Sequence, residues 1–515
     1  MSIVLTTFNA RYSHTSLALR YLLANLGSHA ADTEILEFTL DSRPIDAVEQ
    51  VLASTPKIVG LGVYIWNRPQ SEAFAKLLKK VAPDVILVVG GPEVSFAPED
   101  DLLVATADHV IVGEGELAFS RLISAILNGL PTQKRINDPE PQWDDIILPY
   151  DSYLASDLDS RTVYIESSRG CPFKCAFCLS ADQDGLRMLP LSRLFEALDS
   201  LWSRGARSFK FLDRTFNANK AHALEILGYL QNLGPELEAV HLEIAPQMLG
   251  VELIQALSVF RPGVVQAEVG IQSLNEEVLE RIGRAGKSDR ALGALHQLRM
   301  KTGVHIHADL IVGLPKESLE SFGEGFDRLL RAGPHEIQVG ILKRLFGTPL
   351  ERKATEWKMV FSQDPPYEIL STSDLSFGES MEMRRFARFW DLFANSGHFK
   401  LTLPLLLVSP FEDFLQFSGW LHANNVGSSG IALQRRFRLL FGYLAETGRV
   451  DPGQMAMQMM GDYLNSGFED IPEFLRPHLP ENMDLPTIRH HLGIIAKPAH
   501  SKSHKRQARH SGQGG

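Results

Sequence analysis

Residues 162–180 read TVYIESSRGCPFKCAFCLS, in which an apolar strand leads into a loop that holds the three cysteines of this 515-residue chain. Cys171, Cys175 and Cys178 follow a C-x3-C-x2-C spacing. Closely spaced thiolates suit a soft metal or an iron–sulfur cluster, whereas a closed structural zinc site needs four ligands. A [4Fe-4S] cluster held by three cysteines leaves one iron open to a substrate or cofactor. The loop therefore predicts a reactive cluster rather than a structural metal site.

A Cys3His zinc site is the alternative. Its fourth ligand would be His222, His241 or a more distant histidine. Structural zinc usually takes its ligands from paired short spacings, which the three cysteines do not provide. We therefore prefer the iron–sulfur interpretation, in which Gly170, Pro172 and Phe177 shape a tight loop over the cluster.

The composition of the chain is that of a soluble globular protein. Hydrophobic residues make up 44% and charged residues 22%, and the length predicts about three domains. No apolar run is long enough to cross a bilayer, and the first residues, MSIVLTTFNARYSH, lack the basic segment and cleavage site of a signal peptide. With all three thiols on one loop, a disulfide framework is excluded, which fits a reducing compartment. We expect a cytoplasmic protein without a membrane partner.

The charge distribution gives a second expectation about partners. The net charge of −11 argues against a broad nucleic-acid-binding surface. The one concentrated basic stretch, HSKSHKRQARH, lies near the C-terminus, and we expect residues 496–515 to form a disordered, solvated tail.

Residues 1–130 alternate short apolar runs with helical patterns. This predicts a doubly wound, Rossmann-like parallel sheet that is buried on both faces. Thr15 or Ser16 would cap the first helix, ahead of leucines at helical spacing. Ligands of such sheets bind beyond the carboxyl ends of the strands. The expected strands are Ile3–Thr7, Glu34–Phe38, Lys57–Trp66, Val85–Val89 and His109–Val112.

The loops after these strands carry polar, aromatic and glycine residues. Glycine pairs let the backbone approach a large planar ligand or a phosphate, although a single pair is equally typical of a tight βα turn. The full set, in this order, resembles the cobalamin-binding domain that precedes many radical S-adenosylmethionine (SAM) domains. By this resemblance the cobalamin contacts would be Asn9, Arg11, Tyr12, His14, Tyr64, Trp66, Gly90, Gly91, Pro92, Glu93, Gly113, Glu114 and Gly115.

The first of these loops differs from that of cobalamin-dependent mutases. The mutase loop reads Asp-x-His-x-x-Gly, and its histidine binds cobalt. The corresponding segment here is Asn9-Ala-Arg-Tyr-Ser-His14, so that Arg11 stands at the histidine position. The lower ligand of cobalt therefore stays open, with His14 either as a ligand or as a hydrogen-bonded loop residue.

A second repeating region follows a linker. Residues 131–160 contain prolines and acidic side chains without periodicity, which is typical of a linker. Residues 161–355 again alternate strand and helix, and six strands predict a partial (β/α)6 barrel with its chemistry at the carboxyl ends of the strands. The expected strands are Thr162–Glu166, Ser208–Asp213, Ala239–Ile244, Val264–Gly270, Val304–Val312 and Glu336–Ile341.

The polar residues at these strand ends, together with the cysteine loop, resemble the radical SAM superfamily, in the branch that includes methylthiotransferases and cobalamin-dependent enzymes. Taken singly, each could be an ordinary hydrogen-bonded loop residue. Asp213 would stand nearest the role of the Gly-Gly-Glu motif of other members. The resemblance implies that the methionine amino group and ribose contact Asp213, Glu243, Gln272 and Ser273, that Gly313 and Pro315 shape the adenine pocket, and that Phe177 also contacts SAM.

From about residue 356 the pattern becomes helical. Two sets of apolar residues each fall on one helical face, which predicts core packing, with an aromatic substrate pocket as the alternative. Residues 356–495 resemble the C-terminal helical domain of unassigned function in one subgroup of cobalamin-binding radical SAM proteins, and we expect them to complete or cover the substrate site. The two sets are Phe386, Phe389, Trp390 and Phe393, and Phe437, Leu440, Phe441 and Leu444.

The resemblance as a whole implies a class B methyltransferase-like radical SAM enzyme with three cofactors: a [4Fe-4S] cluster, SAM and cobalamin. The cluster would cleave SAM to a 5′-deoxyadenosyl radical, and cobalamin would carry a methyl group to a carbon centre of the substrate. The partners would be a small-molecule or peptide substrate and an electron donor such as flavodoxin or ferredoxin. Radical rearrangement or cyclisation without net methyl transfer, and a noncatalytic cobalamin or redox sensor, are the alternatives.

Overall fold

The computed structural model describes residues 2–183, 185–284, 286–427, 429–480 and 483–493. The chain divides into two compact units. The first comprises Met1–Glu243, Lys343–Glu356 and Phe361–Glu368, and the second comprises Ile244–Leu342, Trp357–Val360 and Ile369–Gly515. The expected basic tail, residues 496–515, lies outside the described residues.

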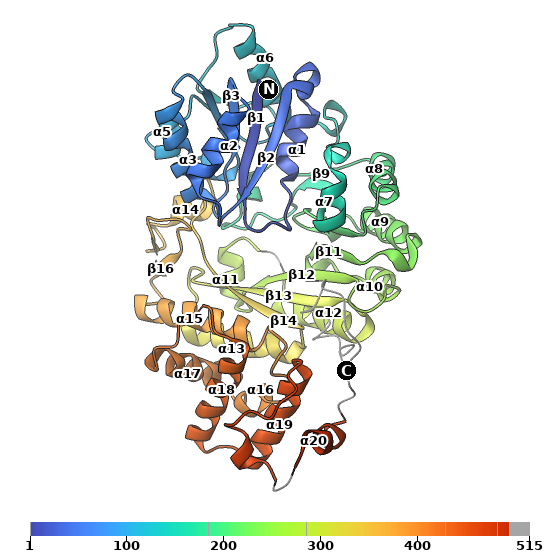
Figure 1. Ribbon diagram of the computed structural model, residues 1–515, viewed down its shortest axis with the longest axis vertical. Coiled ribbons are helices and arrows are strands. Elements are labelled where there is room, and N and C mark those ends of the chain that lie inside the picture. The colour runs from blue at the N-terminus through green and yellow to red at the C-terminus, as the bar shows by residue number, and fades with distance from the viewer. Residues whose placement is uncertain (1, 184, 285, 428, 481–482, 494–515) are drawn as a thin grey trace. The chain divides into compact units, whose positions relative to one another are not determined.

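A parallel sheet forms the N-terminal part of the first unit (Figure 1). Its strand order, β2-β1-β3-β4-β5-β6, places the first strand inside the sheet, as in doubly wound folds. The first helix begins as predicted, because the Ser16 hydroxyl accepts the Leu19 N–H at 3.3 Å. The strands are β1 (Ile3–Asn9), β2 (Thr33–Thr39), β3 (Ile58–Gly62), β4 (Ile86–Gly90), β5 (His109–Ile111) and β6 (Arg135–Ile136). The helices are α1 (Leu17–Ala24), η1 (Gly27–Asp32), α2 (Pro44–Ala53), α3 (Arg68–Val81), α4 (Pro92–Ser95), α5 (Leu102–Thr106) and α6 (Glu116–Leu127).

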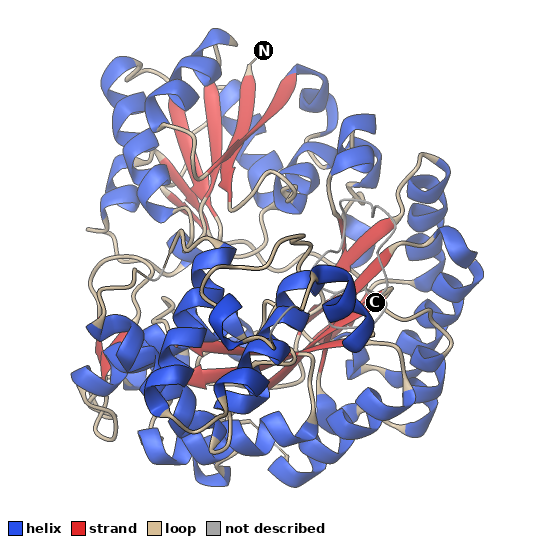
Figure 2. Ribbon diagram, turned by 60° about the horizontal axis from the view of Figure 1, so that its bottom comes forward, coloured by secondary structure: helices blue, strands red, loops and turns tan. Residues whose placement is uncertain are grey.

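Alternate residues of β1 enter two different cores, as a strand buried on both faces requires. Val4 and Phe8 belong to one core, together with Phe74 of α3. Leu5 belongs to the other core, together with Phe119 of α6. Figure 2 shows the strands of this sheet with helices on both sides. The predicted doubly wound sheet is therefore confirmed.

The third strand ends earlier than the sequence predicts. The apolar run suggests a strand to Trp66, but β3 ends at Gly62. The buried side chain of Asn67 is the reason, because its Oδ1 accepts the Tyr64 N–H at 2.8 Å and its Nδ2 donates to the Phe8 carbonyl at 3.1 Å. These bonds fold residues 63–67 into a turn at the carboxyl edge of the sheet.

The segment expected to be a linker contains short elements of its own. Besides β6, these are η2 (Trp143–Asp145), η3 (Tyr150–Ser152) and α7 (Ala155–Ser160). The side chains of Trp143 and Tyr150 are buried. Elements of three to six residues are too short for hydrophobic periodicity to reveal them, which is why the sequence did not indicate them.

A second sheet carries six strands in the order β14-β13-β12-β11-β10-β7. Strands β7, β10 and β11 pair in parallel, as do β12, β13 and β14. Helices alternate with these strands along the chain, as a partial (β/α)6 barrel requires. The strands are β7 (Val163–Ile165), β10 (Ser208–Phe211), β11 (Ala239–Ile244), β12 (Val265–Gln272), β13 (His305–Val312) and β14 (Glu336–Ile341). The helices are α8 (Leu191–Ser203), α9 (Lys220–Asn232), α10 (Val251–Ser258), α11 (Glu276–Arg281), α12 (Ser288–Lys301), α13 (Leu319–Ala332) and α14 (Pro349–Lys353).

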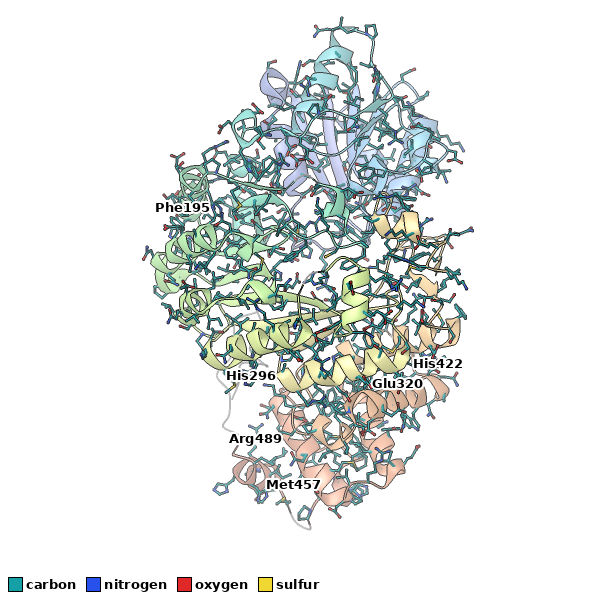
Figure 3. All side chains as sticks on the ribbon, turned by 180° about the vertical axis from the view of Figure 1, so that it is seen from behind. Phe195, His296, Glu320, His422, Met457 and Arg489 are labelled. Carbon is teal, nitrogen blue, oxygen red and sulfur yellow. The ribbon has the colours of Figure 1, made fainter. Side chains whose placement is uncertain are left out.

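Within each unit, aromatic side chains pack neighbouring helices together. In the first unit, Phe195 of α8, labelled in Figure 3, stacks on Tyr229 of α9 with ring centroids 4.5 Å apart. In the second unit, Phe326 of α13 meets Trp390 edge-on, with centroids 4.8 Å apart, and Trp390 lies parallel to Phe386. Edge-on and stacked aromatic pairs are favourable packing geometries.

The C-terminal part of the second unit is helical, as predicted. Both predicted apolar faces are buried, one on α15 and one on α18, which confirms core packing. Among the described residues, no helix has the length and apolar character needed to cross a membrane. The elements are β15 (Val360–Phe361), β16 (Ile369–Ser371), α15 (Phe377–Phe393), α16 (Leu403–Leu406), α17 (Pro410–Ala423), α18 (Leu433–Thr447), α19 (Pro452–Asn465), η8 (Arg476–His478) and α20 (Leu485–His491).

Candidate active site

The cysteine loop lies between the two strands of a short antiparallel hairpin in the first unit. Strand β8 (Ser168–Gly170) pairs with β9 (Leu186–Met188), and Cys171 follows directly. Gly170 has φ +85°, and a Cβ there would lie 2.1 Å from the Gly185 carbonyl oxygen. Only glycine can therefore stand at the entrance of the loop.

Backbone bonds shape the rest of the loop. The Cys178 N–H donates to the Cys175 carbonyl at 2.9 Å, and η4 (Leu179–Asp182) begins at the next residue. The Ala176 carbonyl accepts the Leu350 N–H at 2.8 Å, so that α14 is tied to the loop. Phe177, the predicted SAM contact in this loop, is half-buried.

The donor set of the loop fits an iron–sulfur cluster by its chemistry. None of the three cysteines forms a disulfide in the described structure, and Cys171 and Cys175 are buried. The Thr215 hydroxyl lies 3.6 Å from the Cys171 sulfur, where a hydrogen bond would tune a bound cluster. As the side chains stand, the described part of the chain contains no group of three or more histidine, cysteine, aspartate or glutamate residues placed to hold a metal ion.

Asp213 anchors the start of the hairpin that leads into this loop. Its side chain is 1% exposed. Its Oδ1 accepts the hydroxyls of Ser167 at 2.6 Å and Ser168 at 2.5 Å, and its Oδ2 accepts the Ser167 N–H at 3.0 Å. Burial raises the pKa of Asp213 above its ordinary value, and the bonds from both serines oppose that rise. The contact of Asp213 with SAM stays a prediction, while its contacts within the protein hold the segment ahead of Cys171.

His222 was one candidate for the fourth ligand of a zinc site. It lies on α9 beside Asp213, and burial lowers the pKa of its imidazole. Its Nε2 has no hydrogen-bond partner in the described structure. No metal-holding group that includes it or His241 is found among the described residues.

The first loop of the N-terminal sheet is tied to the barrel. Asn9 Nδ2 donates to the His14 carbonyl at 3.0 Å and to Glu37 Oε1 at 2.9 Å. His14 Nδ1 is hydrogen-bonded to the Tyr164 hydroxyl on β7, and the two rings are stacked. Burial lowers the pKa of His14, with contributions from Lys210 and Arg11. The structure thus gives His14 the role of a hydrogen-bonded loop residue, and its role as a cobalt ligand stays a prediction.

The neighbouring predicted contacts at this edge are more exposed. Arg11 and Tyr12 are exposed, and the Arg161 guanidinium lies 4.3 Å from the centroid of the Tyr12 ring. Tyr64 and Trp66 stack with centroids 4.4 Å apart and planes 5° apart, and Trp66 is 48% exposed. Tyr64 is half-buried, so the pair presents the Trp66 ring to solvent, and a flat aromatic surface suits a large planar ligand.

The two glycine turns at this edge differ. Gly91 has φ +111°, and a Cβ there would lie 2.4 Å from the Val63 carbonyl oxygen, so the turn after Gly90 requires glycine. Gly113 has φ +73° but open space around its missing side chain. Its N–H donates to the Ser95 hydroxyl at 3.3 Å. Gly115, two residues on, is half-buried.

Glu93 follows Gly91-Pro92 but points into the protein. It is buried, and its Oε1 lies 3.9 Å from Arg68 Nη1, too far for a hydrogen bond. The Tyr367 hydroxyl donates to its carboxyl group, yet burial raises the pKa of Glu93 to about 7. Its contact with cobalamin stays a prediction, and the geometry gives it a supporting position beneath the glycine turn.

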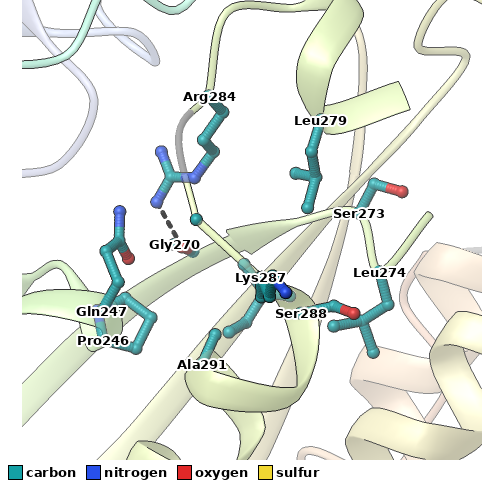
Figure 4. Close-up of a pocket in the computed structure, with 12 residues that line it drawn as sticks. Pro246, Gln247, Gly270, Ser273, Leu274, Leu279, Arg284, Lys287, Ser288 and Ala291 are labelled. Carbon is teal, nitrogen blue, oxygen red and sulfur yellow. Dashed lines mark hydrogen bonds between the residues drawn. The ribbon is translucent and has the colours of Figure 1, made fainter. Parts of the chain in front are cut away.

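In the second unit, a pocket lies beside the end of β12 (Figure 4). It is lined by Ser273, a predicted SAM contact, and by the side chains of Gln247, Arg284 and Lys287. Arg284 Nη2 donates to the Gly270 carbonyl at 2.5 Å. Arg284 and Lys287 are two cations in this lining, and such charges suit a ligand carboxylate. Neither cation was predicted from the sequence, although the segment RIGRAGK, which begins eight residues after Ser273, concentrates positive charge.

The loop after β13 is hydrogen-bonded to the loop after β12. The Ser273 hydroxyl donates to Glu317 Oε1, and both groups are buried. Burial raises the pKa of Glu317 to about 7. Gly313 has φ +88°, and a Cβ there would lie 2.6 Å from Ile369 Cγ2. Glu317, which the sequence analysis did not select, therefore fixes the loop of Gly313 and Pro315 to Ser273.

The remaining predicted SAM contacts lie at strand ends. Gln272 has φ +71° and follows an irregularity in the β12–β13 register. Glu243 is half-buried near the end of β11. Asp213, Glu243 and Phe177 belong to the first unit, whereas Gln272, Ser273, Gly313 and Pro315 belong to the second. All of these SAM contacts stay predictions.

Three family models match the chain in succession. The B12 binding domain matches residues 3–123, and the Radical SAM superfamily matches residues 165–329. The chain carries a B12-binding domain followed by a radical SAM domain. A protein family of unknown function, DUF4080, matches residues 355–491. These matches confirm the predicted family and fold class of this B12-binding radical SAM protein.

Curated relatives share about a quarter of their aligned residues with the chain. An uncharacterized methyltransferase of Pyrococcus horikoshii is 27% identical over 332 residues, which are 59% of this chain and 70% of the relative. The cobalamin-dependent radical SAM methyltransferase TokK of Streptomyces tokunonensis is 27% identical over 331 residues, 56% of this chain and 47% of TokK. The match thus spans less than half of TokK.

Solved structures with the same fold hold the cofactors expected from the sequence. The methyltransferase TsrM of Kitasatospora setae, solved with cobalamin and a [4Fe-4S] cluster, is 17% identical with a TM-score of 0.56, over 74% of this chain and 81% of TsrM. OxsB, solved with aqua-cobalamin and SAM, is 14% identical with a TM-score of 0.63, over 95% of this chain and 83% of OxsB. At these identities the likeness concerns the fold.

Proposed function

We propose that this protein is a cobalamin-dependent radical SAM enzyme that cleaves SAM reductively at a [4Fe-4S] cluster and methylates a carbon centre of its substrate. The observation that carries the proposal is the cysteine loop, which offers three closely spaced thiols at Cys171, Cys175 and Cys178. Three thiolates leave one iron open for SAM. The B12-binding and radical SAM domains, in this order, supply the setting for both cofactors.

The residues of the chain would bind and orient these groups. The cluster and cobalamin supply one-electron chemistry and a methyl carrier, and the protein supplies binding and position. Cys171, Cys175 and Cys178 would hold the cluster. The open turn at Gly113 and the Tyr64–Trp66 pair would receive the corrin.

The barrel loops would hold SAM. Arg284 and Lys287 would provide positive charge for the methionine carboxylate, in a pocket that Ser273 also lines. The predicted contacts Phe177, Asp213, Glu243 and Gln272 would serve the rest of the molecule, with Gly313 and Pro315 at the adenine. The tie between Ser273 and Glu317 keeps two of these loops in register.

The substrate and partners follow from the same reasoning. The substrate would be a small molecule or a peptide, bound with help from the helical region of residues 355–491. Reductive cleavage of SAM requires a low-potential electron donor such as flavodoxin or ferredoxin. An oxygen-sensitive cluster fits a cytoplasmic location.

A second candidate is a radical rearrangement or cyclisation without net methyl transfer. One relative, the anaerobic magnesium-protoporphyrin IX monomethyl ester cyclase of Rubrivivax gelatinosus, is 23% identical over 308 residues. That relative is named as a cyclase, which supports a non-methylating outcome as the second candidate.

The test is an anaerobic incubation of reconstituted protein with methyl-labelled SAM, a low-potential reductant and a metabolite extract. Methylation predicts a labelled product together with 5′-deoxyadenosine and S-adenosylhomocysteine. 5′-Deoxyadenosine without labelled product would support rearrangement. If neither 5′-deoxyadenosine nor S-adenosylhomocysteine forms, the result contradicts the proposed enzyme and favours the noncatalytic sensor. A Cys171→Ala, Cys175→Ala, Cys178→Ala triple variant is the control and should form no 5′-deoxyadenosine.

A further inference from the structure

Arg169 joins the cysteine hairpin to the loop after β5. It lies on β8, two residues ahead of Cys171. Its Nη1 is 2.8 Å from Glu114 Oε2, and its Nη2 is 2.7 Å from Glu116 Oε1. Glu166, on its own segment, lies 3.0 Å from Nη2.

The surroundings of Arg169 fix its position. Its side chain is 10% exposed, and the rings of Tyr21 and Trp143 each lie 4.8 Å from its guanidinium carbon. A buried arginine is stable only when its charge is paired with good geometry, and three carboxylates meet that condition. The planar guanidinium has five donors in a rigid fork, so this arrangement sets direction as well as distance.

The second strand of the hairpin contacts the same loop. Arg187 on β9 stands opposite Arg169 in the β8–β9 register and also pairs with Glu114. Arg187 Nη1 donates to the Pro141 carbonyl at 2.5 Å. Glu114 is therefore shared by one arginine from each strand of the hairpin.

The residues of this network lie next to both proposed cofactor-binding loops along the chain. Between Arg169 and Cys171 stands only Gly170, which is confined by the Gly185 carbonyl. On the other side, Gly113 precedes Glu114 and has open space next to its backbone. A ligand that settles against Gly113 thus touches the residue adjoining the network.

We propose that Arg169 is a positioning residue that couples the corrin-binding loop, residues 113–116, to the cysteine loop, so that cobalamin bound at the first stabilises the cluster held by the second. The inference rests on the proposed function, because it assumes that both cofactors bind. Coupling of this kind is reciprocal, so that a loaded cluster also tightens cobalamin binding. A merely structural ion pair would stabilise the fold equally with and without cobalamin.

The test measures how fast the reconstituted, full-length protein loses its cluster to an iron chelator, with and without saturating hydroxocobalamin. In the wild type, cobalamin should slow the loss by about fivefold or more. In Arg169→Met the two rates should become equal. Arg169→Lys should show an intermediate ratio, because an ammonium keeps the charge but lacks the fork.

Arg20→Met is the matched control. Arg20 is equally buried, pairs with Glu37 and Asp157 at 3.0 and 2.9 Å, and lies 4.8 Å from the Tyr153 ring. It contacts neither the cysteine loop nor residues 113–116. Its variant should show the wild-type ratio even if the fold is less stable.

The outcomes separate the two proposals. If Arg169→Met keeps the wild-type ratio, the coupling is wrong. If wild-type protein binds no cobalamin or no cluster, the proposed function itself fails. Should Arg169→Met not fold, Glu116→Gln provides the second variant, because it removes one paired charge at constant volume. Its ratio should fall below that of the wild type, and an unchanged ratio would overturn the coupling.

Discussion

Two glycines in the first unit show how differently its two cofactor regions are built. Gly170 at the cysteine loop and Gly113 at the corrin edge both have positive φ, at +85° and +73°. Around Gly170 the backbone closes in, whereas around Gly113 the space is open. The cysteine loop is thus constrained by its own chain, as suits a cluster held by covalent ligands. At the proposed corrin edge the room for a reversibly bound ligand lies at Gly113, because Gly91 of the same edge is closed in by the Val63 carbonyl.

The largest expected effect is that of Gly170→Ala. The added Cβ meets a backbone oxygen that cannot rotate away, and the positive φ adds strain, so the loop must change shape at a cost of more than about 4 kcal/mol. After anaerobic reconstitution, this variant should hold almost no iron or sulfide. Gly113→Ala, with strain but no clash, should hold the wild-type amount. Equal cluster content in the two variants would contradict the claim that the cysteine loop requires glycine at position 170 more strictly than the other loop requires it at position 113.

Asp213→Asn should have the next largest effect, which is on the stability of the cluster held by the cysteine loop. An amide cannot accept bonds from all three donors of Ser167 and Ser168, and leaving a buried donor unpaired costs about 1–3 kcal/mol. Cluster loss to a chelator should accelerate by about five- to hundredfold. Asp199→Asn, at an exposed site on α8, is the control and should leave the rate unchanged. An unchanged rate of cluster loss in Asp213→Asn would show that Asp213 does not anchor the segment ahead of Cys171.

Glu93, which follows the Gly91-Pro92 turn, should make the free energy of unfolding depend on pH. Its carboxyl has an ordinary pKa of 4.5, and burial raises that pKa to about 7 in the folded protein. Between these values the folded state holds a proton that the unfolded chain has released, so the stability of the wild type falls as pH rises through this window. The loss is at most about 3 kcal/mol.

Glu93→Gln carries no such proton and should lose this part of the pH dependence. Its apparent melting temperature relative to the wild type should therefore rise from pH 5 to pH 8. Glu99→Gln, at a more exposed carboxylate of the same unit, serves as the control. Parallel curves for Glu93→Gln and the wild type would show that Glu93 is ionised throughout.

Trp66→Ala should have the smallest effect, confined to the open region. Loss of one aromatic surface costs about 1 kcal/mol, which lowers cobalamin affinity by up to about tenfold in equilibrium titration. Ile45→Ala, at a similarly exposed apolar residue of α2, should leave the affinity unchanged. Cluster content should be the same in both variants. Unchanged affinity in Trp66→Ala would place the corrin elsewhere.

The sequence predicts well what depends on local patterns. Apolar runs marked nearly all long strands, because strands buried on both faces are continuously hydrophobic. The cysteine spacing indicated the cluster loop because thiol chemistry is specific. The end of β3 was misplaced, because the turn depends on Asn67, whose partners include a residue 59 positions away.

The candidate site was less predictable for the same reason. The network of Arg169 combines a carboxylate 55 residues away, that of Glu114, with a strand of three residues, and neither carries a periodic signal. Glu93 follows a glycine turn that suggests a surface position, but its side chain turns inward to Tyr367. Such contacts arise only once the chain has folded, so spacing along the sequence does not reveal them.

Electron paramagnetic resonance of the reduced, anaerobically reconstituted protein, recorded before and after addition of SAM, tests the central claim most directly. An iron without a protein ligand should bind SAM, so the account predicts a [4Fe-4S] signal whose g-values shift when SAM is added. Protein that carries zinc in place of iron and sulfide, or a cluster signal that SAM leaves unchanged, would contradict it.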